Sequence, residues 1–138
     1  KTQKIISNLL IILVLLPLLT AMSALQNQSP EKIPVPEKKY VATFIDQTDM
    51  ITECRNISID GETFLEGKRG SGTNTIPFEI IMEVSFIMDG EKLIGAAKLR
   101  DGNSVQLLLN KNQRAYGHTK YGTYQIKLYD LKKMVLSK

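Results

Sequence analysis

The chain has 138 residues, a net charge of +4, one cysteine and one histidine. A single cysteine excludes an intramolecular disulfide, and the sequence has no Cys/His cluster of the kind that holds zinc. Without its first 24 residues, about 114 residues would remain, which is the size of one ordinary domain.

Residues 1–24 have the layout of a secretory signal peptide. Lys1 and Lys4 precede an apolar run at 9–19, and small residues at 21, 23 and 24 precede a polar stretch. That order is typical of a leader that is removed after export. We therefore predict an N-terminal hydrophobic signal helix over 1–24 and an exported protein, periplasmic or secreted. The alternative is an uncleaved leader that anchors the protein in the inner membrane, because 5–24 is long enough to span a bilayer.

Residues 25–39 are expected to form a proline-rich linker, since prolines at 30, 34 and 36 favour an extended chain. From 40 to 138, short runs rich in β-branched and aromatic residues alternate with Asp-Gly turn signals at 60, 89 and 101. We expect strands at 41–45, 51–59, 63–68, 75–81, 83–88, 92–99, 104–109, 114–119 and 124–128. The domain 40–138 is therefore predicted to be all-β, a compact antiparallel sandwich or small barrel of about 8–9 short strands.

Two segments lying 50 residues apart share one pattern. Gly72-Thr73 aligns with Gly122-Thr123, and the apolar residues at 76, 78, 81, 84 and 86 align with those at 126, 128, 131, 134 and 136. The pattern predicts two strand–bend–strand units packed around one core, and chance similarity between β-rich segments is the alternative. Pro77 has no backbone donor, so we expect its strand at a sheet edge or a bulge.

Charge is unevenly distributed along the domain. Residues 40–90 have a balance of −6, and residues 91–138 have a balance of +7. We favour the interpretation that the two parts lie side by side and neutralise each other, because sequential strands usually neighbour each other. The alternative is a basic side that meets an anionic envelope component, such as a phospholipid headgroup or an acidic polysaccharide.

The candidate binding residues are basic and aromatic and lie in one predicted hairpin. They are Arg114, Tyr116, His118, Lys120, Tyr121 and Lys127. Such side chains can stack on sugar rings or hold anionic groups. A three-residue loop at 120–122 would pair His118 with Tyr124 and turn the row 114, 116, 118 toward the core boundary. A two-residue loop would shift the register and turn this row outward.

The sequence predicts no catalytic residue, no metal and no cofactor. His118 has no evident partner to tune it, and the glycine-rich stretch 68–73 lacks the Lys-Ser/Thr ending of a phosphate-binding loop. The acidic residues between 46 and 62 do not have the spacing of a calcium motif. Cys54 is expected to be buried and inert, with a disulfide between chains as the alternative.

These observations predict an exported, non-catalytic binding domain of the cell envelope. Its expected partner is another envelope protein or an anionic polymer, with no nucleic acid, and with membrane contact only if the leader is uncleaved. One alternative is a small periplasmic or secreted hydrolase or glycan-active enzyme that uses His118. The other is a membrane-tethered accessory subunit that keeps its leader.

Overall fold

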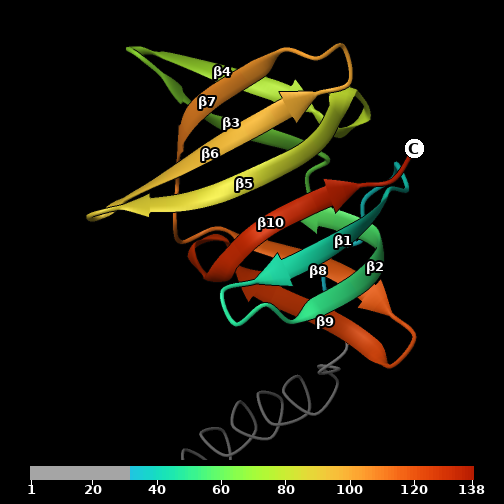
Figure 1. Ribbon diagram of the computed structural model, residues 1–138. Coiled ribbons are helices and arrows are strands. Elements are labelled where there is room, and N and C mark those ends of the chain that lie inside the picture. Colours follow the sequence, from blue (N-terminus) through green and yellow to red (C-terminus); the bar gives the residue numbers. More distant parts are fainter. Residues whose placement is uncertain (1–31) are drawn as a thin grey trace, which may run out of the picture. The chain divides into compact units, whose positions relative to one another are not determined.

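The computed structural model describes residues 32–138 (Figure 1). The predicted signal helix and the first part of the predicted linker lie outside the described residues. Between residues 32 and 138, no helix has the length and apolar character needed to cross a membrane.

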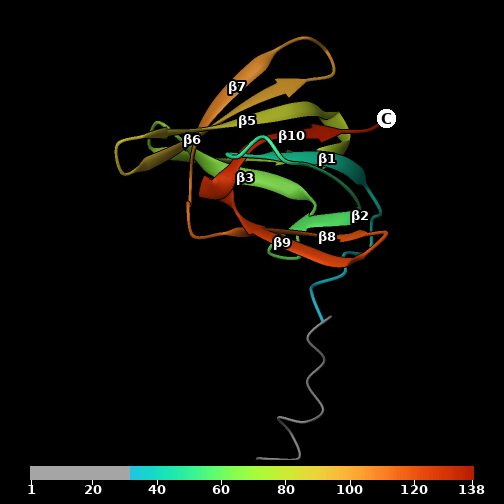
Figure 2. The same ribbon diagram turned by 60° about the horizontal axis from the view of Figure 1, so that its bottom comes forward.

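The described residues form one antiparallel sheet of ten strands, which curls into a half-barrel, so the all-β prediction is confirmed. The strands are β1 (Val41–Asp46), β2 (Ile51–Ile59), β3 (Phe64–Arg69), β4 (Gly72–Pro77), β5 (Ile81–Asp89), β6 (Lys92–Leu99), β7 (Ser104–Leu109), β8 (Arg114–Thr119), β9 (Gly122–Lys127) and β10 (Leu131–Leu136). Their order across the sheet is β4-β3-β7-β6-β5-β10-β1-β2-β8-β9. Figure 2 shows the curl, which brings β5, β6 and β7 to one side and β2, β8 and β9 to the other.

Two details differ from the sequence prediction. The predicted strand at 75–81 ends at Pro77, because a short 3-10 helix, η1 (Phe78–Ile80), turns the chain into β5. The separate strand predictions also missed β10, where two lysines at 132 and 133 interrupt the apolar alternation. The repeat pattern had nevertheless placed a second strand there.

The internal repeat is present in the structure and is more extensive than its sequence signal. The unit β4–η1–β5 recurs as β9–η2–β10, where η2 is the 3-10 helix Leu128–Asp130, and each element begins 50 residues after its counterpart. Each of β1–β5 has a counterpart five strands later in the chain. When every strand in the order is replaced by its counterpart, the same order is obtained, read from the opposite edge of the sheet. The sheet therefore has a pseudo-two-fold axis between β5 and β10.

The two repeats exchange their hairpins. β3 pairs with β7 of the second repeat, and β8 pairs with β2 of the first repeat. This exchange interleaves strands of the acidic and basic parts of the chain, and Lys133 and Glu83 form an ion pair of 3.4 Å between the two parts. The arrangement agrees with the interpretation that the two parts neutralise each other.

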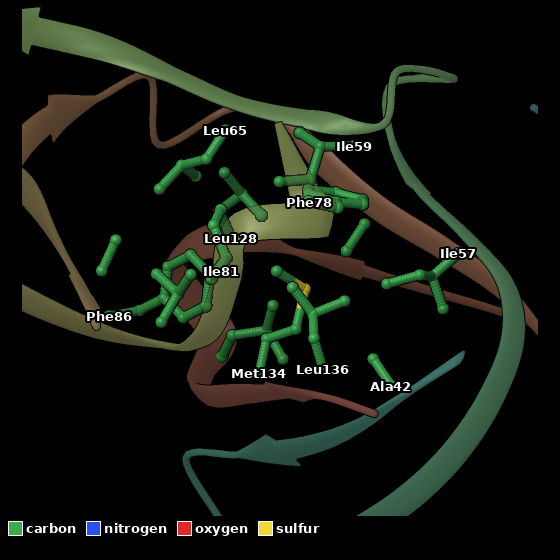
Figure 3. Close-up of a cluster of buried hydrophobic side chains, with 14 of the residues drawn as sticks. Ala42, Ile57, Ile59, Leu65, Phe78, Ile81, Phe86, Leu128, Met134 and Leu136 are labelled. Carbon is green, nitrogen blue, oxygen red and sulfur yellow. The ribbon is translucent and has the colours of Figure 1, made fainter. Parts of the chain in front are cut away.

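The concave side of the sheet is filled by apolar side chains from both repeats (Figure 3). The repeat positions lie at its centre: Phe78, Ile81 and Val84, like their counterparts at 128, 131 and 134, have no exposed surface. Each such side chain contributes about 1.5–3 kcal/mol through burial. Since the interior is packed, a binding site is to be sought on the outer face, at the sheet edges or at the loops.

Two smaller expectations also concern this sheet. β4, which ends in Pro77, lies at one edge of the sheet, as the proline predicted. Cys54 is a free thiol on β2 and is only 2% exposed, which agrees with the buried and inert interpretation.

Candidate functional site

The β8–β9 hairpin has a two-residue loop. Thr119 pairs with Gly122 and His118 pairs with Thr123, so the three-residue alternative, in which His118 faces Tyr124, is wrong. The Thr119 hydroxyl fixes the turn, because it donates to the Gly122 carbonyl at 3.0 Å and accepts the Tyr121 N–H at 3.0 Å.

This register places the row 114, 116, 118 on the outer face of β8. Ala115 and Gly117, which alternate with that row, are both buried toward the core. Directly opposite residues of antiparallel strands share a face, so Lys127 of β9 lies beside Arg114 on the same side. Four of the six candidate residues are thus brought together on the outer face.

A further cation joins this group from β2. Arg55 pairs with His118, and its Nη1 donates to the Thr119 carbonyl at 3.5 Å. Sequence reasoning missed Arg55, because only the long-range pairing of β2 with β8 brings it there. We call this group the basic strip; it consists of Arg55, Arg114, Tyr116, His118 and Lys127.

The basic strip has three permanent cations, Arg55, Arg114 and Lys127. No acidic residue occurs anywhere from 114 to 127. The Arg114 guanidinium donates from Nη1 to the neutral Gln125 amide at Oε1, 3.2 Å away, and the Arg114 backbone N–H donates to the Asp60 carboxylate, also at 3.2 Å. The strip therefore presents positive charge on the outer face of the edge hairpin.

His118 differs from a triad histidine in the surroundings of its Nδ1 atom. Among residues 32–138, no group hydrogen-bonds to its buried Nδ1 atom. A catalytic imidazole of the triad type is held at Nδ1 by a carboxylate, which fixes its tautomer and stabilises its charged form. The described part of the chain also contains no group of three or more His, Cys, Asp or Glu side chains placed to hold a metal ion.

The two remaining candidates, Lys120 and Tyr121, line a cleft at the end of the hairpin. The cleft has a volume of about 650 Å³ and lies between the start of β2 and the turn of β8–β9. We call it the tip cleft; it is lined by Met50, Ile51, Thr52, Glu53, Thr119, Lys120, Tyr121, Thr123 and Tyr124. Its β2 side was not predicted, because those residues are about seventy positions from the hairpin in sequence.

Aromatic rings lie on the hairpin side of the tip cleft. Tyr121 is 88% exposed, and the Lys120 ammonium lies 5.0 Å from its ring centroid. Tyr124 is half-buried and stacks on Phe44, with ring centroids 5.8 Å apart. Burial raises the pKa of Tyr124, although a hydrogen bond with the Thr52 hydroxyl opposes this effect. The Tyr124 hydroxyl is therefore neutral at ordinary pH.

The loop on the β2 side of the tip cleft is held by Asp46. Its Oδ1 atom accepts from the Thr48 hydroxyl at 2.6 Å, the Thr48 N–H at 2.8 Å and the Met50 N–H at 3.0 Å. These bonds, chiefly the one from the Thr48 hydroxyl, hold the pKa of Asp46 below its ordinary value. The carboxylate is therefore ionised at neutral pH, where it holds the Met50 backbone in place.

A protein-family model described as "Uncharacterised protein" matches residues 36–138. The chain belongs to this family. The family region contains all ten strands, and therefore both the basic strip and the tip cleft. No curated protein and no solved structure matches the chain.

Proposed function

We propose that this family domain is a non-catalytic binding module of an exported cell-envelope protein, and that its basic strip binds an anionic polymer. The observation that supports the proposal is the row of cations on the outer face of an edge hairpin that has no acidic residue of its own. The secretory pattern of residues 1–24 supports the location.

The dimensions of the strip suit a polymer. Arg114 and His118 are four positions apart on β8, and Lys127 and Arg55 lie on the strands to either side. At about 3.4 Å per residue, the strip extends about 13 Å along the strand. Positive groups spread over such a length can contact several charges of one extended chain, whereas a small anion would contact only part of them.

The proposal is tested by measuring the affinity of the protein for two anionic polymers, polygalacturonate and polyphosphate. The test variant is Arg114→Gln/Lys127→Gln. The matched control is Lys68→Gln/Arg69→Gln, which removes the same charge from two exposed positions on β3 of the other repeat.

We expect the strip variant to bind both polymers about tenfold more weakly, since two exposed charge contacts of up to about 1 kcal/mol each are lost. Affinity should also fall as salt is raised, because exposed charges are screened over about 10 Å at 0.1 M. An equal loss in the control variant, or no binding of either polymer at low salt, would contradict the proposal.

A further inference from the structure

We propose that the tip cleft is a subsite for a sugar ring, and that the anionic polymer is therefore an acidic polysaccharide. In this arrangement one sugar residue stacks on Tyr121 and its carboxylate pairs with Lys120. The inference rests on the proposed function, because it assigns the chemical class of the polymer that the basic strip binds.

The tip cleft is continuous with the basic strip. Thr119 lines the cleft and its carbonyl accepts the hydrogen bond from Arg55. Thr123 also lines the cleft and lies opposite His118 on the outer face. A chain bound along the strip can therefore continue into the cleft without crossing a strand.

The size and lining of the cleft suit a sugar. Its volume of about 650 Å³ lies within the range of ligand sites, about 300–1,000 Å³. An aromatic face packs against the apolar C–H face of a sugar ring, and Tyr121 is largely exposed for this contact. The Glu53 carboxylate and the Thr123 hydroxyl line the same space and can hydrogen-bond to sugar hydroxyls.

The internal repeat provides a comparison for the turn of this hairpin. The β3–β4 hairpin is the counterpart of β8–β9, and at an offset of 50 residues it has Gly70, Ser71 and Asn74. The corresponding residues of the second repeat are Lys120, Tyr121 and Tyr124. A two-residue hairpin loop thus forms at the counterpart position with Gly70 and Ser71, and Tyr124 packs on Phe44 of the core, so the exposed Lys120 and Tyr121 are the side chains that favour a ligand.

A membrane surface is the competing occupant. Met50 and Ile51 are each 63% exposed beside Tyr121, and apolar loop ends of this kind can enter a bilayer. We favour the sugar because Thr52, Glu53 and Thr123 line the same cleft with polar groups, which can hydrogen-bond to sugar hydroxyls but would lose their partners among lipid acyl chains. Binding to vesicles is therefore one outcome of the test.

The test measures binding of the full-length protein and its Tyr121→Ala and Tyr121→Phe variants. The probes are polygalacturonate, polyphosphate of similar length, and phosphatidylglycerol vesicles. Ser71→Ala, at the counterpart position in the first repeat, is the matched control. Thermal unfolding of each variant verifies that the fold is intact, as expected for an exposed side chain.

We expect Tyr121→Ala to weaken polygalacturonate binding about fivefold to tenfold and to leave polyphosphate binding unchanged, because polyphosphate has no ring to stack. Tyr121→Phe should retain most of the affinity, and Ser71→Ala all of it. If both polymers bind through the strip but Tyr121→Ala has no effect, the sugar subsite is refuted while the proposed function stands. If neither polymer binds, both are refuted. Vesicle binding that depends on Tyr121, without polygalacturonate binding, assigns the cleft to a membrane and overturns the inference.

Discussion

Position 117 on β8 requires a residue without a side chain. A Cβ atom added to Gly117 would lie 2.7 Å from Cβ of Cys54, 3.2 Å from its Sγ and 3.2 Å from Cγ2 of Ile57. Cys54 and Ile57 are buried residues of β2, and a Cβ atom cannot rotate away. We therefore expect Gly117→Ala to force β8 away from β2, at the contact where the second repeat is joined to the first.

The expected loss of stability follows from two opposing effects. Overpacking of a core costs about 1–3 kcal/mol. The change from glycine to alanine also stabilises the protein by about 0.4–1 kcal/mol, because alanine restricts the unfolded chain more than glycine does. The net loss is about 0–2.6 kcal/mol, and about 1.5 kcal/mol would lower the midpoint of thermal unfolding by about 6–12 °C in a domain of this size.

The assay is equilibrium unfolding in urea, followed by circular dichroism, with Gly72→Ala as the matched control. Gly72 has an ordinary φ, and the nearest atom to its added Cβ is the Arg69 carbonyl oxygen at 3.8 Å. Gly72→Ala should therefore be neutral or slightly stabilising. In the double variant Gly117→Ala/Cys54→Ala the Sγ contact disappears but the 2.7 Å contact between Cβ atoms remains, so recovery should be small. Equal stability of Gly117→Ala and Gly72→Ala would refute the close approach of β8 and β2.

Two further predictions concern Cys54 and the exchanged hairpins. Burial raises the pKa of Cys54 from its ordinary value of 9.0 to about 11, so at pH 8 the native protein should react with a thiol reagent about 100-fold more slowly than the urea-unfolded protein. The thiol has a higher pKa in the folded protein than in the unfolded chain, so the folded protein loses stability as the pH rises from about 9 toward 11. The Cys54→Ala variant should lack this pH-dependent loss. Rapid labelling of the native thiol would contradict its burial. Gly90 and Glu91 lie in an exposed turn, and cleavage between them would separate the two repeats. The two fragments should reassemble into a one-to-one complex with the native circular dichroism spectrum, because each fragment supplies a hairpin to the sheet of the other. Fragments that fold separately and do not associate would contradict the exchanged pairing.

Local sequence patterns predicted most of the strands and much of the core. The shared apolar positions were visible because inward-facing residues alternate along a strand, and Pro77 marked an edge because it cannot donate to a ladder. The single curled sheet was not predictable in this way. Its pairings of β3 with β7 and of β2 with β8 join strands tens of residues apart, and no local pattern specifies such partners.

Only part of the candidate site was predictable from the sequence, because local patterns do not specify the partners of a strand or the length of a turn. The six residues of the hairpin were visible as a basic and aromatic cluster, but the face they occupy depended on loop length. Lys120-Tyr121 is not one of the glycine-containing pairs that mark a two-residue turn in sequence, so the register stayed open. One missed signal was Asn56, which has a φ of +51° at the irregularity between Arg55 and Ser58. Asparagine tolerates this conformation, so it could have indicated the bulge beside Arg55.

The duplicated architecture separates what the fold requires from what it does not. Where both repeats must satisfy the same packing, they agree: Gly67 and Gly117 are equivalent, and an added Cβ at either would lie within 3 Å of atoms of the strand from the other repeat. Where the chain is exposed at the hairpin turn, the repeats differ, with Ser71 in one and Tyr121 in the other. An exposed tyrosine contributes little to stability through burial, and the first repeat forms a two-residue loop with serine at the counterpart position. For this reason we place the proposed binding site on the β8–β9 hairpin and not on β3–β4, although both lie at an edge of the same sheet.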